Sequence, residues 1–284
     1  MDARPSPEQR ALAGAADRLA ARLGPTTVRD LDDLERRVRL DGALTQAGWR
    51  ALRTGSPTEP VASGVEAAMI ARALARRACD TAFIGPVLAH DLLRRAGTAG
   101  DLALAMAGDL QGVGMTTGST VERSGLAFEV ADTTTAALLL TPADHGYSLV
   151  ATAFGPTVTG VDLTRSVAPI VAGTPVRPVA GAAKVTRDDL IAWTALAVTL
   201  TAADLVGAIR TWLAESGDTV KRSHADDSYW TMLGDWHRTL YDAGFFAVTW
   251  PKQYGGSELS PVCEVIIDEE LARAGPPRNR TGAI

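Results

Sequence analysis

The sequence is poor in cysteine, in aromatic residues and in runs of a single charge. Its 284 residues include two cysteines, Cys79 and Cys263, which cannot build a disulfide framework and have no partner at metal-ligand spacing. Acidic residues (33) outnumber basic ones (28), and there is no basic cluster. This balance argues against nucleic acid or an anionic membrane as the main partner. We therefore expect a protein of the reducing cytoplasm without a metal site.

No apolar run is long enough to span a membrane. The longest charge-free run, Leu190 to Ala203, falls short of the about twenty residues that a bilayer requires. Asp204 and Arg210 interrupt the same predicted helix, so we interpret it as a buried helix of a soluble protein. The N-terminus lacks the apolar core of a secretory signal.

Signatures of common enzyme sites are also missing. The sequence has no Gly-x-Ser-x-Gly nucleophile elbow, and Gly112-x-Gly114 lacks the third glycine of a dinucleotide fingerprint. Glu269 and Glu270 are adjacent on a predicted helix, so they point about 100° apart and cannot work as an acid/base pair; we expect both to be solvated. These patterns predict no catalytic residue.

The first hundred residues have the helical period. Ser6, Pro7 and Gln9 form a capping-box start, and Gly24 ends the helix that follows. Ser63 predicts the start of another helix, and residues 86–95 a further one. Between them, Trp49 and Leu52 indicate a helix that stops near Gly55.

The pattern then changes twice. Short apolar runs such as 136–140, 147–151 and 158–161 alternate with turn residues, which predicts a small antiparallel sandwich or barrel. From Thr186 the helical period returns in a long helix, apolar on nearly all sides, that must be enclosed by partners. Two more helices follow, one ending at Gly244 and one starting at Ser260.

We therefore predict an α+β, mainly helical fold with an N-terminal helical domain (1–100), a middle β-domain (101–185), a long central helix (186–225) and a helical tail (226–284). The tail echoes the start, because residues 69–76 align with residues 266–273 at a constant offset of 197. Trp49 and Leu52 also mirror Trp236 and Leu240. Either two amphipathic helices resemble each other by chance, or residues 226–284 open a second copy of the first domain.

The tail carries a resemblance to a known family. Residues 240–244 (LYDAG), 249–251 (TWP), 254–256 (YGG), 260–261 (SP) and 269–278 (EELARAGPPR) resemble the opening helical segment of acyl-CoA dehydrogenases. Residues 1–215 resemble the same family more faintly, in the order helical region, β-region, long helix. The chain is thus similar to a degenerate or truncated tandem member.

The resemblance implies a chemistry and a cofactor. Members of this family use FAD to dehydrogenate acyl-CoA thioesters between the α and β carbons, with a glutamate as base. Their flavin-contacting stretch corresponds here to residues 114–120, in which Thr116 matches the motif and Thr117 replaces its glutamate. The resemblance therefore implies Thr116 and Thr117 as cofactor-binding residues. It supports no candidate for the catalytic base.

Two functions remain open at this point. The chain is either an acyl-CoA dehydrogenase of fatty-acid, lipid or sterol side-chain catabolism, active only within a larger or hetero-oligomeric assembly, or a non-catalytic subunit that docks on an active homologue. Both readings imply a homo- or hetero-oligomer with an acyl-CoA dehydrogenase, and the first implies an acyl-CoA substrate.

Overall fold

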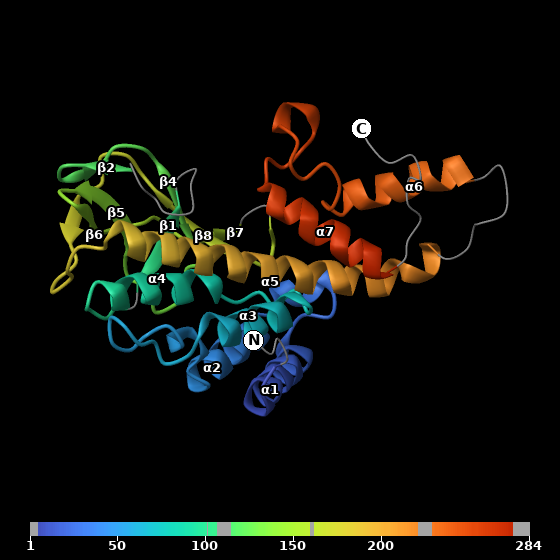
Figure 1. The fold of residues 1–284 in the computed structure, drawn as a ribbon, viewed down its shortest axis with the longest axis horizontal. Coiled ribbons are helices and arrows are strands. Elements are labelled where there is room, and N and C mark those ends of the chain that lie inside the picture. Colours follow the sequence, from blue (N-terminus) through green and yellow to red (C-terminus); the bar gives the residue numbers. More distant parts are fainter. Residues whose placement is uncertain (1–4, 101, 107–114, 160–161, 221–228, 275–284) are drawn as a thin grey trace. The chain divides into compact units, whose positions relative to one another are not determined.

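The computed structural model describes residues 5–100, 102–106, 115–159, 162–220 and 229–274. The chain divides into two compact units, residues 1–201 (unit 1) and residues 202–284 (unit 2), and one long helix runs through the boundary. Figure 1 shows the order of the elements along the chain.

Unit 1 begins with a layer of helices. Its members are α1 (Pro7–Leu23), η1 (Val28–Asp32), α2 (Leu34–Gln46), η2 (Trp49–Ala51), α3 (Gly64–Ala75) and α4 (Ile84–Arg95). Two predicted starts are confirmed: Ser6 accepts a hydrogen bond from the backbone of Gln9 in a full capping box, and the Ser63 side chain caps α3. These caps satisfy backbone N–H groups that the first turn of a helix leaves without partners.

The helix predicted around Trp49 is wrong. Trp49 opens the short 3-10 turn η2, and the true helix of this region, α2, ends before it at Gln46. Gly48, which lies between them, has φ of +68°, a left-handed conformation that interrupts a helix. The apolar pattern of α2 is weak because Leu34 and Val38 are exposed, which explains why the sequence did not reveal it.

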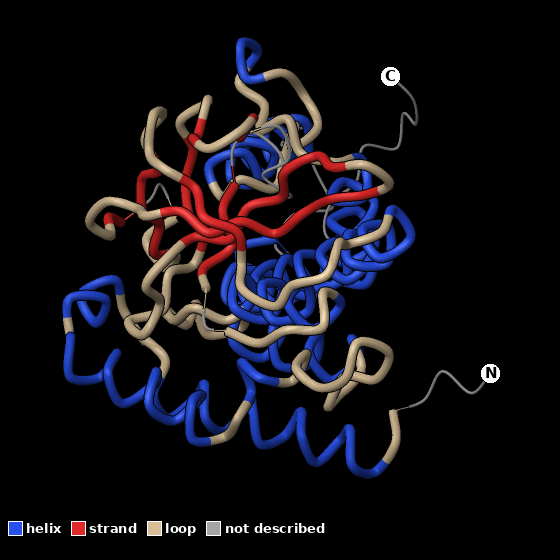
Figure 2. Tube along the Cα trace, turned by 90° about the vertical axis from the view of Figure 1, so that its left-hand side faces the viewer, coloured by secondary structure: helices blue, strands red, loops and turns tan. Residues whose placement is uncertain are grey.

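The second layer of unit 1 is a β-module. Its strands are β1 (Ala103–Met106), β2 (Thr116–Thr117), β3 (Thr120–Val121), β4 (Gly125–Phe128), β5 (Ala137–Ala143), β6 (Gly146–Thr152), β7 (Val158–Thr159), β8 (Ser166–Ile170) and β9 (Val176–Pro178). Seven of them form one sheet in the order β7-β8-β4-β1-β5-β6-β9, and β2 pairs with β3 alone. Figure 2 shows the strands gathered beside the helices.

The sheet is mixed, whereas an antiparallel one was predicted. β4 runs antiparallel to β1 on one side, and β5 then joins the other side of β1 in parallel. The long hairpin β5–β6, by contrast, is antiparallel over seven residue pairs and contains two of the predicted strands. Its inward side chains, among them Leu139 and Val150, are buried in the core of the module. The predicted α+β, mainly helical fold class is confirmed.

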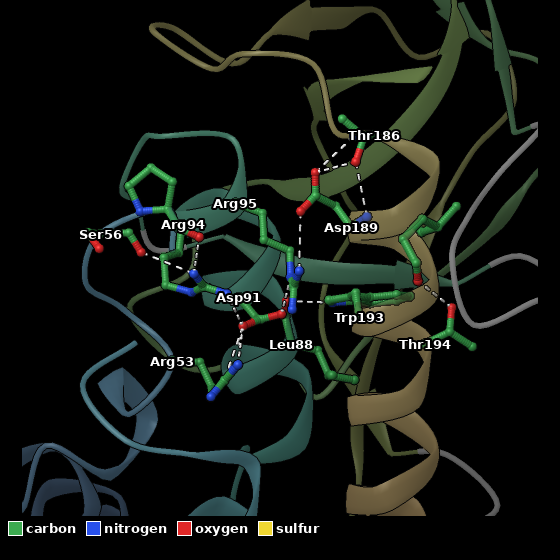
Figure 3. A network of polar contacts seen from close by, with 12 residues as sticks. Arg53, Ser56, Leu88, Asp91, Arg94, Arg95, Thr186, Asp189, Trp193 and Thr194 are labelled. Carbon is green, nitrogen blue, oxygen red and sulfur yellow. Dashed lines mark hydrogen bonds and ion pairs between the residues drawn. The ribbon is translucent and has the colours of Figure 1, made fainter. Parts of the chain in front are cut away.

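A buried charge cluster joins α4 to the helical layer and to the last helix of unit 1 (Figure 3). The Asp91 carboxylate, which is fully buried, accepts hydrogen bonds from Arg53, Arg94 and Arg95 at 3.0, 3.0 and 2.7 Å. Arg95 also reaches Asp189 at the start of α5 (Arg187–Val220), at 3.3 Å. Burial raises the pKa of Asp91, but the hydrogen bonds from Arg95 and Arg94 outweigh it and hold that pKa below its usual value.

Helix α5 is fixed to unit 1 on one face only. Trp193 is fully buried and donates a hydrogen bond from Nε1 to the Leu88 carbonyl at 2.9 Å. The opposite face is bare, since Ile191 is 60% and Val198 41% exposed. Within this chain the predicted enclosure of the helix is therefore incomplete, and its completion by a partner chain stays a prediction.

By length and composition α5 could also cross a membrane. The segment Arg187–Glu215 has a mean hydropathy of 1.7 over its most apolar window, one third of which is buried. Such a test is weak evidence, because the core helix of a soluble protein passes it as well. The buried Trp193 face is typical of such a core helix.

Unit 2 contains the rest of α5 together with α6 (Tyr229–Asp242), the 3-10 turn η3 (Lys252–Tyr254) and α7 (Pro261–Ala274). Its core consists of Ile209, Leu213, Trp236, Leu240, Val248 and Ile267. Glu270 is 4% exposed and forms a two-bond ion pair with Arg210, at 2.7 and 2.9 Å, so the prediction that it is solvated is wrong. The hydrogen bond from Arg210 lowers the pKa of Glu270.

The internal repeat has matching geometry in the two units. Ser63 and Ser260, 197 residues apart, accept hydrogen bonds from the backbone two residues on, at 3.2 and 3.4 Å. The next helix in each unit buries an isoleucine at the same offset, Ile70 and Ile267.

The part of the repeat that rests on two tryptophans is wrong. Trp49 lies in η2, whereas Trp236 lies inside α6, so they occupy different elements. The glycines that follow α2 and α6 are the better match, because Gly48 and Gly244 both adopt the left-handed conformation, with φ of +68° and +77°.

We predict that Asp91→Asn lowers the free energy of unfolding of unit 1 by about 3–5 kcal/mol at pH 7, because three arginines lose their buried anion. The folded pKa of Asp91 is lowered, so its contribution is present above the unfolded pKa of about 3.9 and is lost as the pH falls further. The deficit of the variant should therefore shrink in acid. Urea unfolding followed by circular dichroism at pH 7 and pH 3 measures both effects.

The matched control is Asp17→Asn, which breaks the exposed pair between Asp17 and Arg76. We expect a change of at most about 1 kcal/mol. Equal losses in the two variants would contradict the role of the Asp91 cluster.

Candidate functional site

The helical layer of unit 1 meets the β-module at the N-terminus of α4. Phe83 precedes this helix and its side chain provides no cap. The Glu129 carboxylate, which follows β4, takes that role: its Oε2 accepts hydrogen bonds from the backbone N–H of Phe83 at 2.9 Å and of Gly85 at 2.8 Å. A negative charge at this end of a helix also interacts favourably with the helix dipole.

The contact is close, and it constrains both chain segments. Gly85 lies against the β-module so tightly that an added Cβ would be 2.5 Å from the Phe128 carbonyl oxygen. Glu129 has φ of +51°, a conformation that a non-glycine residue adopts only when its surroundings enforce it. The carboxylate is fully buried and forms an ion pair with Arg165, which also lies 3.6 Å from Asp162.

A polar cavity of about 150 Å³ lies beside this contact. Its walls come from α2, from the loop before α4 and from loops of the β-module; they include Arg37, Asp41, Asp80, Thr81, Asp132, Thr157, Arg165 and Ser166. Most of these groups already have partners inside the protein. Asp41, for example, accepts a hydrogen bond from Thr81 at 2.7 Å and pairs with Arg50.

Asp80 is only partly satisfied. One of its oxygens, Oδ2, pairs with Arg36 Nη2 at 2.7 Å. The other, Oδ1, is buried and has no hydrogen-bond partner among the described residues. A buried carboxylate oxygen without a donor is costly, so this position calls for a donor.

Three comparisons with known proteins bear on this architecture. Residues 201–281 match the family model of the acyl-CoA dehydrogenase N-terminal domain. The match begins where unit 2 begins, at the boundary between Thr201 and Ala202. No curated protein sequence matches the chain.

Solved structures match over nearly the whole chain. The ChsE4–ChsE5 complex from Mycobacterium tuberculosis is similar with a TM-score of 0.59 and 17% identity, over 97% of this chain and 85% of that one. The Tcur3481–Tcur3483 steroid ACAD gives 0.55 and 13% (94% and 83% covered), and butyryl-CoA dehydrogenase from Megasphaera elsdenii gives 0.52 and 11% (96% and 87%). The chain has the acyl-CoA dehydrogenase fold. The resemblance found in the sequence is confirmed.

The two threonines implied as flavin contacts of an acyl-CoA dehydrogenase lie on the small strand β2. Thr116 is fully buried, and its Oγ1 has no hydrogen-bond partner among the described residues. Thr116 does not line the cavity. Gly114, the first residue of the flavin stretch, lies outside the described residues. The cofactor role of both threonines stays a prediction.

The cavity beside the N-terminus of α4 is too small for FAD. Sites for drug-sized ligands typically measure about 300–1,000 Å³, and FAD is larger than most such ligands. The cavity has about 150 Å³, and the buried Thr116 hydroxyl is closed to any ligand in this conformation. Glu129 cannot serve as the base of an acyl-CoA dehydrogenase here, because both of its oxygens are held by α4 and Arg165.

Other reactive groups give no competing site. Among the described residues, no group of three His, Cys, Asp or Glu side chains could hold a metal ion. Burial raises the pKa of the Cys79 thiol to about 12, so it stays protonated at neutral pH.

The sequence did not point to Glu129, Arg165 or Asp80. They lie far apart in the chain and carry no motif, and only the packing of α4 on the sheet brings them together. The positive φ of Glu129 marks this position as constrained, but a backbone angle can be seen only in the structure.

Gly85→Ala should destabilise unit 1 by about 1–3 kcal/mol, because the new Cβ collides with the Phe128 carbonyl. The opposite sign is expected from helix propensity alone, which favours alanine over glycine by about 1 kcal/mol. Gly42→Ala is the control: this glycine lies in α2 with nothing within 4 Å of its added Cβ, and the change should stabilise. Thermal unfolding of both variants measures the effect, and a stabilised Gly85→Ala would contradict the close contact.

Proposed function

We propose that this chain is the flavin-free partner half of an acyl-CoA dehydrogenase. Dehydrogenation of the acyl-CoA thioester takes place on a flavin-bearing copy, and unit 1 supplies a rigid body on which that copy assembles. The chain is then active only within a larger or hetero-oligomeric assembly. Its own residues bind and position the partner and perform no chemical step.

The bare face of α5 carries this proposal. Ile191, Ala195 and Val198 repeat at helical spacing and are exposed on one side of the helix, while the other side is packed in unit 1. An apolar stripe on an otherwise anchored helix is the usual form of a helix–helix interface. The interior of unit 1 offers no comparable site, since its charges are committed to each other around Asp91 and Glu129.

The comparisons support a paired arrangement. Two of the similar structures are described as complexes or pairs of chains, ChsE4–ChsE5 and Tcur3481–Tcur3483, and the second is described as a steroid ACAD. The family model matches unit 2 but not unit 1. This supports unit 2 as the opening of a second, better preserved copy, following a first copy that has diverged.

The steroid relative also suggests a substrate. We propose the CoA thioester of a lipid or sterol side chain, degraded in the cytoplasm.

A second candidate is that the chain binds FAD and catalyses by itself. Thr116 favours it, because its buried Oγ1 has no hydrogen-bond partner among the described residues and would gain one if this region opened to a flavin. In that case Thr116 and Thr117 contact the flavin, and acyl-CoA is a direct ligand.

Ile191→Glu combined with Val198→Glu should abolish assembly, because two charges on the stripe would have to be desolvated. The full chain is co-expressed with flavin-bearing acyl-CoA dehydrogenases of its own genome. Co-purification and acyl-CoA oxidation are then measured. We expect a complex that oxidises acyl-CoA with the native chain, at least tenfold less of it with the double variant, and no oxidation by the chain alone.

Val171→Glu is the matched control, since Val171 is 60% exposed but lies on the β-module. It should assemble normally. Oxidation of acyl-CoA by the purified chain alone would favour the second candidate, and assembly that survives the double variant would contradict the role of the stripe.

A further inference from the structure

Helix α2 carries exposed apolar side chains on its outer side. Leu34 and Val38 lie four residues apart, so they share one face of the helix, and they are 66% and 54% exposed. Gly42, one turn further along this side, is exposed and has nothing within 4 Å of an added Cβ. The opposite face, with Leu40 and Leu44, is fully buried in unit 1. Leu34, Val38 and Gly42 (the α2 surface) are therefore open to another helix.

The repeated helical unit does not require such a surface. Helix α6 of unit 2 corresponds to α2, and each is followed by a left-handed glycine, Gly48 and Gly244. When these glycines are aligned, Gly234 takes the position of Val38, and Arg238 takes that of Gly42. Both residues of α6 are exposed. The exposed valine of α2 is thus not needed to form the unit itself.

Two unlike charges flank the α2 surface on one side. Glu35 and Arg39 are exposed and lie four residues apart, and neither has an ion pair or a side-chain hydrogen bond among the described residues. When two identical helices pack antiparallel, the same flank of each helix meets, and the two run in opposite directions. Glu35 of each copy then lies opposite Arg39 of the other, twice over by symmetry. The two helix dipoles also oppose each other in this arrangement.

From this self-complementary pattern we infer that α2 joins two copies of this chain, packed antiparallel about a two-fold axis. Leu34 and Val38 of one copy pack on the same residues of the other, and Gly42 lets the backbones approach closely. Two pairs of Glu35 with Arg39 close one side of the contact. One short helix from each copy makes a weak interface, below about 1,200 Å², so the dimer is reversible. The inference does not depend on the proposed function, because it involves neither a flavin nor α5.

Sedimentation equilibrium of the full chain alone, at concentrations from about 1 μM to about 200 μM, tests the inference. We expect a monomer–dimer equilibrium. Val38→Glu should raise its dissociation constant by about tenfold or more, because two carboxylates would have to be desolvated in the contact. Val65→Glu is the matched control, since Val65 is 50% exposed on another helix, α3, and should leave the dimer unchanged. Circular dichroism checks that both variants fold.

The flanking charges give a second test that needs no apolar substitution. Glu35→Arg and Arg39→Glu each place like charges opposite each other, so each variant alone should dimerise more weakly than the native chain. Mixed in equal amounts, the two variants should dimerise as tightly as the native chain, because every contact between positions 35 and 39 again joins opposite charges. A mixture that stays as weak as its components would contradict the antiparallel pairing.

Two results would overturn the inference as a whole. One is a monomer at every concentration. The other is a dimer that survives Val38→Glu but is lost when Ile191→Glu and Val198→Glu are combined, because the copies would then meet through α5. We expect this α5 double variant to dimerise normally. Its assembly with a flavin-bearing homologue is a separate measurement, so the inference and the proposed function can fail independently.

Discussion

The structure of unit 1 depends on one buried carboxylate. Glu129 leaves the β-module in a left-handed conformation and caps the N-terminus of α4, a helix whose own preceding residue provides no cap. Arg165 neutralises the charge from the other side. Because Gly85 allows the two backbones to touch, the carboxylate joins helical layer and sheet directly, without room for a bound group between them. The contact of Glu129 and Phe128 with the N-terminus of α4 therefore occupies the space beside that end of the helix.

The opposite end of α4 is fixed by charges as well. Asp91 forms ion pairs with three arginines. One of them, Arg95, also pairs with Asp189 and so links α4 to α5. Helix α4 is therefore held at one end by the sheet and at the other by its neighbours, and α5 is held along one face only. The bare apolar stripe on α5 offers a surface on which another protein can pack. This stripe is the physical basis for the proposed partner role.

Local signals in the sequence predicted much of the fold. Ser6 and Ser63 mark helix starts because a hydroxyl two or three residues before a free N–H can cap it through local contacts alone. The family motif in residues 240–278 was equally readable, since it is contiguous. The long hairpin of the sheet was visible because its apolar runs are bounded by turn residues.

Non-local interactions were beyond the sequence. The sequence alone suggests that Glu270 is a solvated helix residue. In the structure it is buried in unit 2 and paired with Arg210, sixty positions earlier. The parallel pairing of β1 with β5 depends on which side of β1 remains free after β4 has paired. The polar cavity could not be anticipated for the same reason. Its walls come from segments that lie far apart in the sequence.

FAD loading measures whether unit 1 accepts a flavin, as the proposed partner role requires that it does not. The purified full chain is equilibrated with excess FAD, passed through gel filtration and examined for visible flavin absorbance. We expect a colourless protein fraction. A yellow fraction with one flavin per chain would contradict it, because it would require the Glu129 contact or the buried Thr116 region to open.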